Sequence, residues 1–487
     1  MLSSVSPRTG DHRNPVDEAS VYDVAAAVDR SVAVAPAYAR LSLAQRAAFL
    51  RAAADALEAN RDAIVETADF ETGLGPARFN GELDRTTGQI RAFADVVEDG
   101  SFQEVIHTVA DPSAKPPRPD LRRMLIPLGP VGIFTPSNFP LAFGVAGGDP
   151  ASALAAGCPV VVKGHPSHPN SSVLTAQAFT DAAKATGTPV DVVLLVQSRA
   201  PEVSRALVNA PGIRAIAFTG SERVGRLLCD VAAARPDPIP FYGELGSLNP
   251  VFIGRAATAA RGAAIAQGLV TSMTLGSGQF CTKPGVVFVP TGAEGDALVA
   301  AMESELATRE PHVLLNAGLQ QSLTDRLNAS RAVKGVREVA AACDVPAAGS
   351  FAAPRLLLTD ASTFFSNPAL QEEHFGPLSI VVRCDAGNMT TAASRFDGQL
   401  TATIHADEAD LVWAKELLPV LVEKAGRIVW NGYPTGVAVV PAMHHGGPYP
   451  AATNALHTSV GTTAIRRFLR PVTFQNVPDN LLPAELA

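Results

Sequence analysis

The chain has 487 residues, which is long enough to bury a large core in more than one lobe and excludes a small scaffold held by disulfides. Hydrophobic residues make up 47% and charged residues 18% of the chain, and no apolar run reaches the roughly 20 residues of a membrane helix. Acidic residues outnumber basic ones by 47 to 39, for a net charge of −8. We therefore expect a soluble globular protein with no membrane and no nucleic-acid partner.

The cysteines indicate a reducing compartment. There are five, an odd number, and no two of them form a CxxC pair. This pattern argues against a disulfide framework and against a structural metal site, so we expect no metal and a cytoplasmic location. The N-terminal segment has no apolar core of the kind found in a secretory signal, and we expect none.

The first part of the chain is predicted to be helical. Apolar residues recur at helical spacing between positions 21 and 72, which predicts two amphipathic helices, and the pattern continues over 81–98. A polar, Pro-rich stretch at 107–120 then predicts a surface ribbon or linker.

Short β-branched runs alternate with helical ones over 129–250, as in PVVVKG, VDVVLLV and AIAFTG. Strands buried on both faces of a doubly wound parallel sheet have this pattern. A second set, including PVFIG, GVVFVP, PLSIVVRC, TATIHA and RIVWNG, predicts a second α/β lobe. The C-terminal segment reads as an apolar strand with a Pro-broken tail, and its exposed edge is expected to pair with another subunit.

Two residues stand out as candidates for chemistry. Cys281 lies among glycines and small polar residues in TLGSGQFCTKPG, a setting that suits a nucleophilic thiolate, whereas the other four cysteines adjoin apolar or helical segments and are expected to be core residues. Glu244 lies in a turn between Gly243 and Gly246. It is either a solvated loop residue or a general base to which the glycines give a ligand close access.

Two further segments are typical of anion binding. AFTGSERVG ends a strand and opens a helix, so Gly220 and Ser221 are positioned to meet a phosphate. Lys163 follows the run VVV at a strand end and is one of only seven lysines, although a solvated lysine is the alternative. The pair His444 and His445 in MHHGGP is similar to a serine hydrolase oxyanion loop, but the chain has no GxSxG, which excludes that class.

Seven ordered segments together resemble the aldehyde dehydrogenase superfamily: PLGPVGIFTPSNFPLAF, VVVKGHPSHP, AFTGSERVG, ELGSLNP, GQFCTKPG, EEHFGP and WNGYPTGV. The resemblance runs from about residue 20 to near the end. YGELGSLNP and HHGGPYPAATNALHTSVGTTAIRRFLRPV are most similar to the branch that contains 2,5-dioxovalerate (α-ketoglutaric semialdehyde) dehydrogenases.

The resemblance implies two doubly wound α/β lobes and a β oligomerisation segment. The implied boundaries are a cofactor-binding domain over 1–245 with a bridging segment near 108–127, a catalytic domain over 246–448, and an oligomerisation segment over 449–487. It also implies assembly into a homodimer or homotetramer.

The resemblance further assigns roles to residues. Cys281 would attack the aldehyde, Asn138 and the Cys281 N–H would hold the oxyanion, and Glu244 would activate the water that hydrolyses the thioester. NADP or NAD would be bound by residues in both halves of the chain: Lys163, Ser167, Gly220, Ser221, Glu373 and Phe375.

Two positions depart from relatives. Pro166 replaces a glutamate that binds the adenosine ribose in NAD-preferring enzymes, so NADP is permitted, with His165, Ser167 and Arg199 as candidate phosphate contacts. Ala146 replaces an arginine that binds the substrate carboxylate in succinic semialdehyde dehydrogenases, and Arg85 is the candidate in its place.

The favoured activity is oxidation of 2,5-dioxovalerate to 2-oxoglutarate through a cysteine thioester. Three alternatives stay open: a dehydrogenase for succinic semialdehyde or an aliphatic aldehyde, a CoA-acylating enzyme, and a non-enzymatic structural protein of the same fold. Glu244 favours water over CoA as the acyl acceptor.

Overall fold

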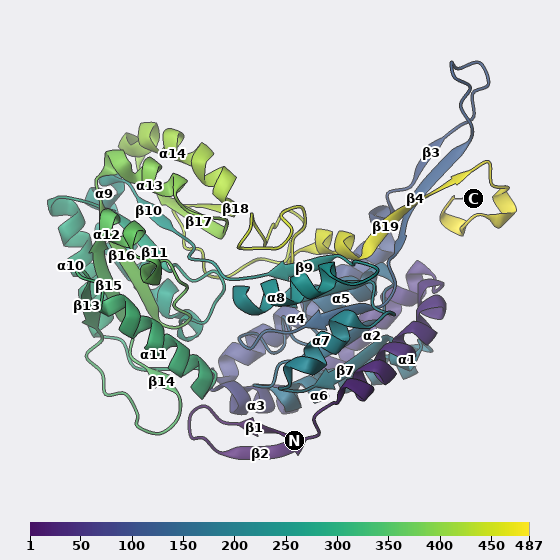
Figure 1. Cartoon of the computed structure of the whole chain (residues 1–487), viewed down its shortest axis with the longest axis horizontal. Helices are drawn as coiled ribbons and strands as arrows, with labels where there is room; N and C mark the ends of the chain where they lie inside the picture. Colours follow the sequence, from purple (N-terminus) through teal and green to yellow (C-terminus); the bar gives the residue numbers. More distant parts are fainter. Residues whose placement is uncertain (487) are drawn as a thin grey trace.

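The computed structural model describes residues 1–486 and shows two α/β lobes side by side with a β arm projecting from the first lobe (Figure 1). The N-terminal hairpin of β1 (Leu2–Val5) and β2 (His12–Val16) lies along the first lobe. Within these residues, no helix is long and apolar enough to cross a membrane.

The first lobe contains a five-stranded parallel sheet in the order β7-β6-β5-β8-β9. Its strands in chain order are β5 (Val131–Phe134), β6 (Val160–Gly164), β7 (Val193–Gln197), β8 (Ala215–Thr219) and β9 (Phe241–Glu244). From β5 the chain adds β6 and then β7 on one side, and it then crosses to the other side of β5 to add β8 and β9. Ligands of open α/β sheets bind outside the carboxyl ends of the strands at such a reversal.

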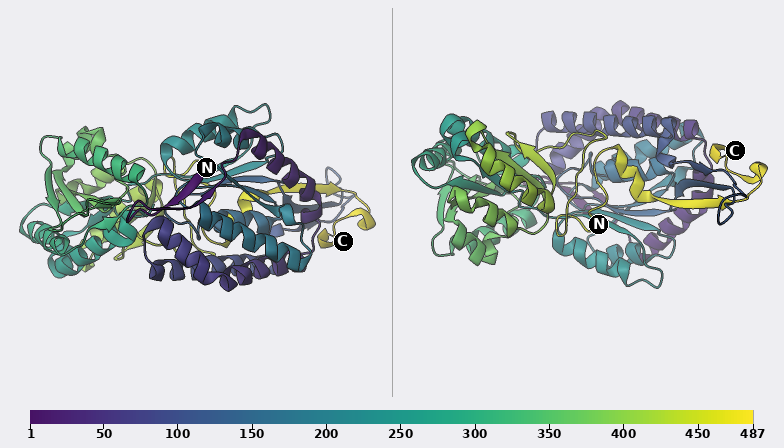
Figure 2. Two further views of the ribbon diagram at one scale, coloured as in Figure 1. Left: turned by 90° about the horizontal axis from the view of Figure 1, so that it is seen from below. Right: turned by 90° about the horizontal axis from the view of Figure 1, so that it is seen from above.

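Helices cover both faces of this sheet (Figure 2). Alternate strand residues face opposite cores, as Val160 and Val162 do on one face and Val161 does on the other. The larger core packs against α2 (Leu43–Ala59), α3 (Arg61–Thr72), α4 (Pro76–Asp99), α5 (Gly148–Ala156) and α6 (Pro169–Thr186). The smaller core packs against α1 (Val21–Ala39), α7 (Pro201–Asn209) and α8 (Glu222–Ala233).

The prediction of two helices over 21–72 was wrong, because the structure has three: α1, α2 and α3. The additional break falls at Asn60, whose backbone leaves helical geometry (φ −104°, ψ 16°) and whose side-chain amide donates to the carbonyl of Ala56. Asparagine competes with the helix through such local hydrogen bonds. The apolar spacing continues across this break, which is why the sequence pattern did not reveal it.

The second lobe contains a seven-stranded sheet in the order β13-β15-β16-β11-β10-β17-β18, parallel except for β13. Its strands are β10 (Val251–Ile253), β11 (Val286–Pro290), β13 (Arg337–Ala340), β15 (Arg355–Asp360), β16 (Leu378–Cys384), β17 (Gln399–His405) and β18 (Ala425–Trp430). One face packs against α9 (Arg255–Thr274) and α10 (Ala293–Ala307). The other packs against α11 (Ala317–Arg331), α12 (Ala361–Ser366), α13 (Met389–Ser394) and α14 (Leu411–Lys424), and a small ladder joins β12 (His312–Val313) to β14 (Phe351–Ala352).

The arm is an antiparallel sheet of β3 (Ile106–Thr108), β4 (Leu121–Pro127) and β19 (Leu469–Gln475). The Pro-rich stretch forms the projecting connection between β3 and β4 (Figure 1). β19 pairs with β4 along its whole length, and its other edge has no strand partner within residues 1–486. Pairing of that edge with another subunit stays a prediction.

Candidate active site

A cavity of about 440 Å³ opens at the carboxyl ends of β5, β6 and β8 and reaches the second lobe. Its volume lies in the range of small-molecule sites. Eight of the nine predicted site residues line it: Asn138, Lys163, Gly220, Ser221 and Glu244 from the first lobe, and Cys281, Glu373 and Phe375 from the second. The ninth, Ser167, does not line the cavity, and its hydroxyl accepts a hydrogen bond from Asn316 (2.9 Å).

Cys281 follows a tight loop after α9. Gly278 has φ +67°, and a Cβ there would lie 2.2 Å from the carbonyl oxygen of Gly376, so only glycine fits. Asn249 fixes the other side of the loop by donating to the carbonyls of Cys281 (2.8 Å) and Lys283 (2.9 Å). The glycines that marked this segment therefore hold the thiol at the cavity wall.

Glu244 is not in a turn, as the sequence suggested, but is the last residue of strand β9 at the sheet edge. Its carbonyl accepts from the N–H of Gly220 (3.1 Å), and its side chain is 2% exposed. The solvated-loop alternative is therefore wrong. FYGE was missed as a strand because it is short and contains a glycine and a charge, which are uncommon in strands.

His445 lies between Glu244 and Cys281. Its Nε2 is 2.7 Å from Glu244 Oε1 and 3.4 Å from Cys281 Sγ, and its side chain is 1% exposed. The hydroxyl of Ser459 donates to the other carboxylate oxygen of Glu244 (2.6 Å). Sequence reasoning weighed His445 only as part of a serine hydrolase loop, and the pair of histidines beside Gly446 and Gly447 was the signal available.

The pKa values of Cys281 and Glu244 are shifted in opposite directions. Burial, reinforced by the Glu244 carboxylate, raises the pKa of Cys281 well above its usual value, and Arg85 partly offsets this rise. Burial also raises the pKa of Glu244, but the interactions with His445 and Ser459 outweigh it and leave that pKa below its usual value. Glu244 is therefore a carboxylate at neutral pH, next to a thiol that retains its proton.

Asn138 lies beside the cysteine loop in the segment that follows β5. One N–H of its amide donates to the carbonyl of Gln279 (2.8 Å), two residues before Cys281. An amide carries two N–H donors, so the second is available to a ligand in the cavity. Asn138 is thus close to Cys281, as an oxyanion donor must be.

Further residues of the cavity offer donors of the kind that a dinucleotide requires. Lys163 is the penultimate residue of β6. Burial lowers its pKa to about 8, and Glu18 partly offsets the fall. Ser221 begins α8 without capping it by its side chain, and the hydroxyl of Thr219 is buried with no hydrogen-bond partner among residues 1–486. These groups offer an ammonium, free helix N-terminal amides and a hydroxyl, which are donors that a pyrophosphate and a ribose require.

Glu373 and Phe375 approach the cavity from the second lobe. A Cβ on Gly246 would lie 2.9 Å from the Glu373 carboxylate, so this glycine makes room for it. Burial raises the pKa of Glu373 to about 7, and Lys283 partly offsets the rise. As a carboxylate, Glu373 would accept hydrogen bonds from ribose hydroxyls.

The predicted phosphate contacts divide into two groups. His165 and Pro166 line the cavity beside Lys163, whereas Arg199 is exposed and does not line it. Burial, with His168 and Lys163, lowers the pKa of His165 well below its usual value, so its ring is neutral at pH 7. Apart from His165, the basic residues that line the cavity are Lys163 and Arg326.

Two arginines of α4 pack on aromatic rings next to the cavity, although neither is among the residues that line it. Arg85, the predicted candidate, lies over Phe143 (5.1 Å) and Phe139 (5.7 Å), and Arg78 lies over Phe139 (4.3 Å) and Phe280 (5.3 Å). Nε and Nη2 of both arginines are buried without a hydrogen-bond partner among the described residues. Arg78 was missed because it precedes the helical pattern predicted over 81–98 and is one of 32 arginines in the chain.

Glu82 lies between the two arginines on the same face of α4. Its Oε2 is 3.2 Å from Arg78 Nη2, out of line for a hydrogen bond, and its Oε1 accepts from the N–H groups of Leu141 and Ala142 (2.9 and 3.0 Å). One carboxylate thus faces two guanidinium groups. Buried polar donors are normally paired, so these unpaired donors point to an anionic ligand.

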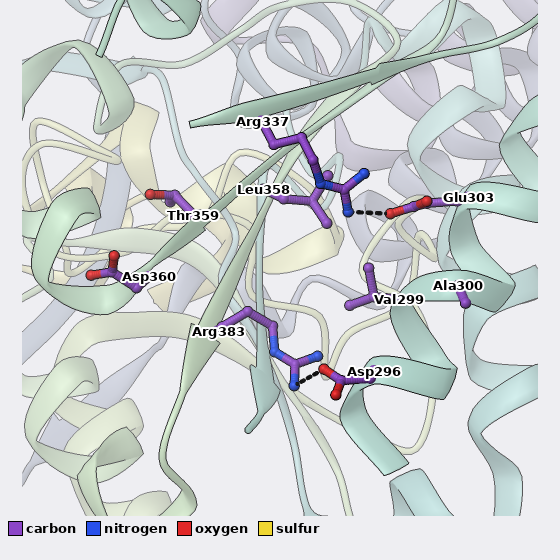
Figure 3. Close-up of a pocket in the computed structure, with 9 residues that line it drawn as sticks. All are labelled: Asp296, Val299, Ala300, Glu303, Arg337, Leu358, Thr359, Asp360 and Arg383. Carbon is purple, nitrogen blue, oxygen red and sulfur yellow. Dashed lines mark hydrogen bonds and ion pairs between the residues drawn. The ribbon is translucent and has the colours of Figure 1, made fainter. Parts of the chain in front are cut away.

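A second hollow, of about 490 Å³, lies in the second lobe between α10 and the sheet (Figure 3). Its arginines are already paired, Arg337 with Glu303 and Arg383 with Asp296 (2.7 Å). None of its lining residues belongs to the cavity around Cys281. The chemistry is therefore concentrated between the lobes.

Comparisons with known proteins agree with this site. The aldehyde dehydrogenase family matches residues 1–468. α-Ketoglutaric semialdehyde dehydrogenase 2 of Azospirillum brasilense is 46% identical, over 100% of this chain and 93% of that protein. α-Ketoglutaric semialdehyde dehydrogenase of Acinetobacter baylyi is 44% identical, over 90% of this chain and 84% of that protein.

Solved structures share the fold at low identity. A point mutant of 1-pyrroline-5-carboxylate dehydrogenase of Thermus thermophilus has a TM-score of 0.84 at 21% identity, covering 98% of this chain and 90% of that one. Glyceraldehyde-3-phosphate dehydrogenase of Methanocaldococcus jannaschii, complexed with NADP, has a TM-score of 0.81 at 18% identity, covering 98% of both chains.

The chain belongs to the aldehyde dehydrogenase family, a class of oxidoreductases that oxidise aldehydes with NAD or NADP. Within this family its sequence is similar to α-ketoglutaric semialdehyde dehydrogenases. The predicted family, fold class and enzyme class are confirmed.

Proposed function

We propose that this chain oxidises 2,5-dioxovalerate (α-ketoglutaric semialdehyde) to 2-oxoglutarate with NADP or NAD, using Cys281 as the nucleophile. The two relatives with 46% and 44% identity carry this activity in their names. The substrate assignment rests on Nε and Nη2 of Arg78 and Arg85, which are buried without a hydrogen-bond partner among the described residues. Arg78 is ion-paired with Glu82 (3.2 Å) but does not donate a hydrogen bond to it.

These arginines fit a substrate with a carboxylate at the end away from its aldehyde. They pack on the rings of Phe139 and Phe280, which directly follow Asn138 and precede Cys281 in the sequence. A carboxylate bound by the arginines would leave the other end of a short chain near the thiol. The net charge of −8 cannot attract this anion, so a local cation has to do so.

The residues divide the reaction into two stages. In acylation, the Cys281 sulfur bonds to the aldehyde carbon while the side-chain amide of Asn138 and the Cys281 N–H donate to the oxyanion. Lys163, Ser221 and Glu373 would hold NADP or NAD, which would supply the hydride acceptor for this stage. In deacylation, Glu244 takes a proton from water, and the hydroxide attacks the thioester and releases the acid.

Water is favoured over CoA as the acyl acceptor. Glu244 is buried, is a carboxylate at neutral pH and lies in the same cluster as Cys281, so a base for water is present. Retention of this base beside the thiol also speaks against a purely structural protein.

Cofactor choice depends on the wall beside Lys163. Pro166 lines the cavity where a carboxylate would repel a 2′-phosphate, so NADP is expected to serve at least as well as NAD. Lys163 and Ser167 are the proposed partners on this side, although the Ser167 hydroxyl would have to exchange its partner Asn316 for the cofactor.

The same proposal covers the organisation of the chain. Residues 1–245 bind the cofactor, with a bridging segment near 108–127, residues 246–448 carry the catalytic cysteine, and residues 449–487 mediate assembly. The free edge of β19 supports a homodimer or homotetramer, and five free thiols within the described residues support a cytoplasmic location. Light scattering of the purified protein tests assembly, and a monomer at micromolar concentration would contradict it.

Initial rates test the substrate and cofactor together. We expect the highest kcat/KM for 2,5-dioxovalerate, a lower value for succinic semialdehyde and the lowest for pentanal, each measured with NADP and with NAD. A preference for pentanal would refute the substrate assignment. Turnover that requires CoA would refute the role of water.

A further inference from the structure

His445 connects the two groups on which both stages of the reaction depend. It is 164 residues from Cys281 and 201 residues from Glu244 in sequence, yet Sγ, Nε2 and a carboxylate oxygen of the three side chains all lie within 4.8 Å of one another. The proposed function gives roles to Cys281 and Glu244 and none to His445.

Two hydrogen bonds fix the backbone of His445. The N–H of His445 donates to the hydroxyl of Thr458 (2.8 Å), and its carbonyl accepts from the N–H of Ser459 (2.8 Å). The Ser459 hydroxyl binds the carboxylate oxygen of Glu244 that faces away from the ring. Nε2 is therefore fixed between one carboxylate oxygen and the sulfur.

The 2.7 Å separation of Nε2 and Oε1 requires a proton between them. Glu244 is ionised, so this proton belongs to Nε2, which donates to the carboxylate. The thiol next to it retains its own proton, because burial and the charges of Glu244 and Glu373 outweigh the influence of Arg85. A nucleophilic thiolate consequently needs a proton acceptor and a new hydrogen-bond donor.

We propose that His445 is a catalytic residue of the acylation stage, whose Nε2–H stabilises the Cys281 thiolate. The S–H bond of Cys281 breaks and an O–H bond forms on Glu244. The negative charge moves from the carboxylate to the sulfur, and the Nε2–H donation moves with it, from Oε1 to Sγ. This step rests on the proposed roles of Cys281 and Glu244, and it needs no other reactant.

The same donor also prepares the second stage. Once the sulfur is part of a neutral thioester, it no longer attracts the Nε2–H. Glu244 releases its proton to solvent, and the Nε2–H returns to the carboxylate, which is then the base for water. One hydrogen-bond donor thus serves two anions in turn.

Alkylation of Cys281 tests this inference without any aldehyde. The full-length enzyme is treated with iodoacetamide between pH 6 and 10, and modification is followed by mass spectrometry on the peptide that contains Cys281. His445→Phe keeps a ring but removes the donor, and His445→Ala is a second variant without the donor. His445→Gln retains a side-chain N–H, and His444→Ala is the matched control at the neighbouring, half-buried histidine.

We expect the alkylation profiles of His445→Phe and His445→Ala to move upward by about one to two pH units, because the hydrogen bond to the Cys281 thiolate is lost. At pH 7.5 this shift corresponds to modification that is about 10- to 100-fold slower. The upward shift of the alkylation profile in His445→Gln, in pH units, should be at most half of the shift in His445→Phe. The profile of His444→Ala should match that of the parent. Thermal unfolding identifies the folded variants.

Coincident profiles for the parent and a folded donor-free variant would overturn the inference, as would equal shifts in the Phe and Gln variants. A merely structural role for His445 predicts slower thioester hydrolysis with an unchanged alkylation profile. If alkylation of Cys281 in the parent left dehydrogenase activity intact, the proposed function itself would fail, which is a separate outcome.

Discussion

Replacement of Arg85 by alanine tests whether α4 binds the substrate carboxylate. Two N–H groups of Arg85 are buried without a partner among the described residues, so a ligand carboxylate would be their first hydrogen-bond acceptor. A hydrogen bond to a charged group contributes about 1.5–3 kcal/mol. At about 1.36 kcal/mol per decade, kcat/KM for 2,5-dioxovalerate should fall about 10- to 150-fold, mostly through KM.

Initial rates with 2,5-dioxovalerate and pentanal measure this effect, since pentanal has the same carbon count without the carboxylate. Arg91→Ala is the matched control, because Arg91 lies on the exposed side of α4 and pairs with Asp55 (2.8 Å). Arg78→Ala is a less clean probe, since it removes the ion-pair partner of buried Glu82 and is expected to lower stability by about 1–3 kcal/mol. An equal loss for both aldehydes in Arg85→Ala would show that Arg85 is structural.

Three further outcomes follow from the site. Asn138→Ala should lower kcat by about 10²–10³-fold through loss of an oxyanion donor, and a loss under threefold would contradict that role. NADP should be used at least as well as NAD, and a hundredfold preference for NAD, about 2.7 kcal/mol, would refute the argument from Pro166. Because the pKa of Lys163 is about 8, its ammonium is charged below that pH and neutral above it, so KM for NADP should rise above pH 8. A constant KM from pH 7 to 9.5 would contradict this.

The sequence predicted the two sheets because buried parallel strands have a distinctive composition. Runs such as Val160–Val162 and Val286–Val289 alternate with helical segments, and these strands form where expected. Short or polar elements gave no such signal. The strand Phe241–Glu244 was read as a turn, and the break at Asn60 was missed because the apolar spacing runs through it.

The sequence predicted those site residues whose position depends on their neighbours along the chain. Gly278 leaves room for the backbone of Gly376, and Gly246 leaves room for the carboxylate of Glu373. In the sequence, these glycines pointed to the segments that contain Cys281 and Glu244. His445 and Arg78 act through side chains brought together only by the fold. The contact of His445 with Glu244 spans 201 residues, and no local pattern encodes such a contact.

Trapping of the thioester in Glu244→Gln tests the proposed mechanism most directly. Acylation should be slower but should survive in this variant. The Cys281 proton then passes to solvent in place of Glu244, removal of the Glu244 charge lowers the pKa of Cys281, and the His445 N–H is free for the sulfur. Mixing the variant with 2,5-dioxovalerate and NADP should give a burst of NADPH of about one per subunit and a 2-oxoglutaryl adduct on the peptide that contains Cys281. Absence of the adduct, or an adduct on another cysteine, would contradict the mechanism.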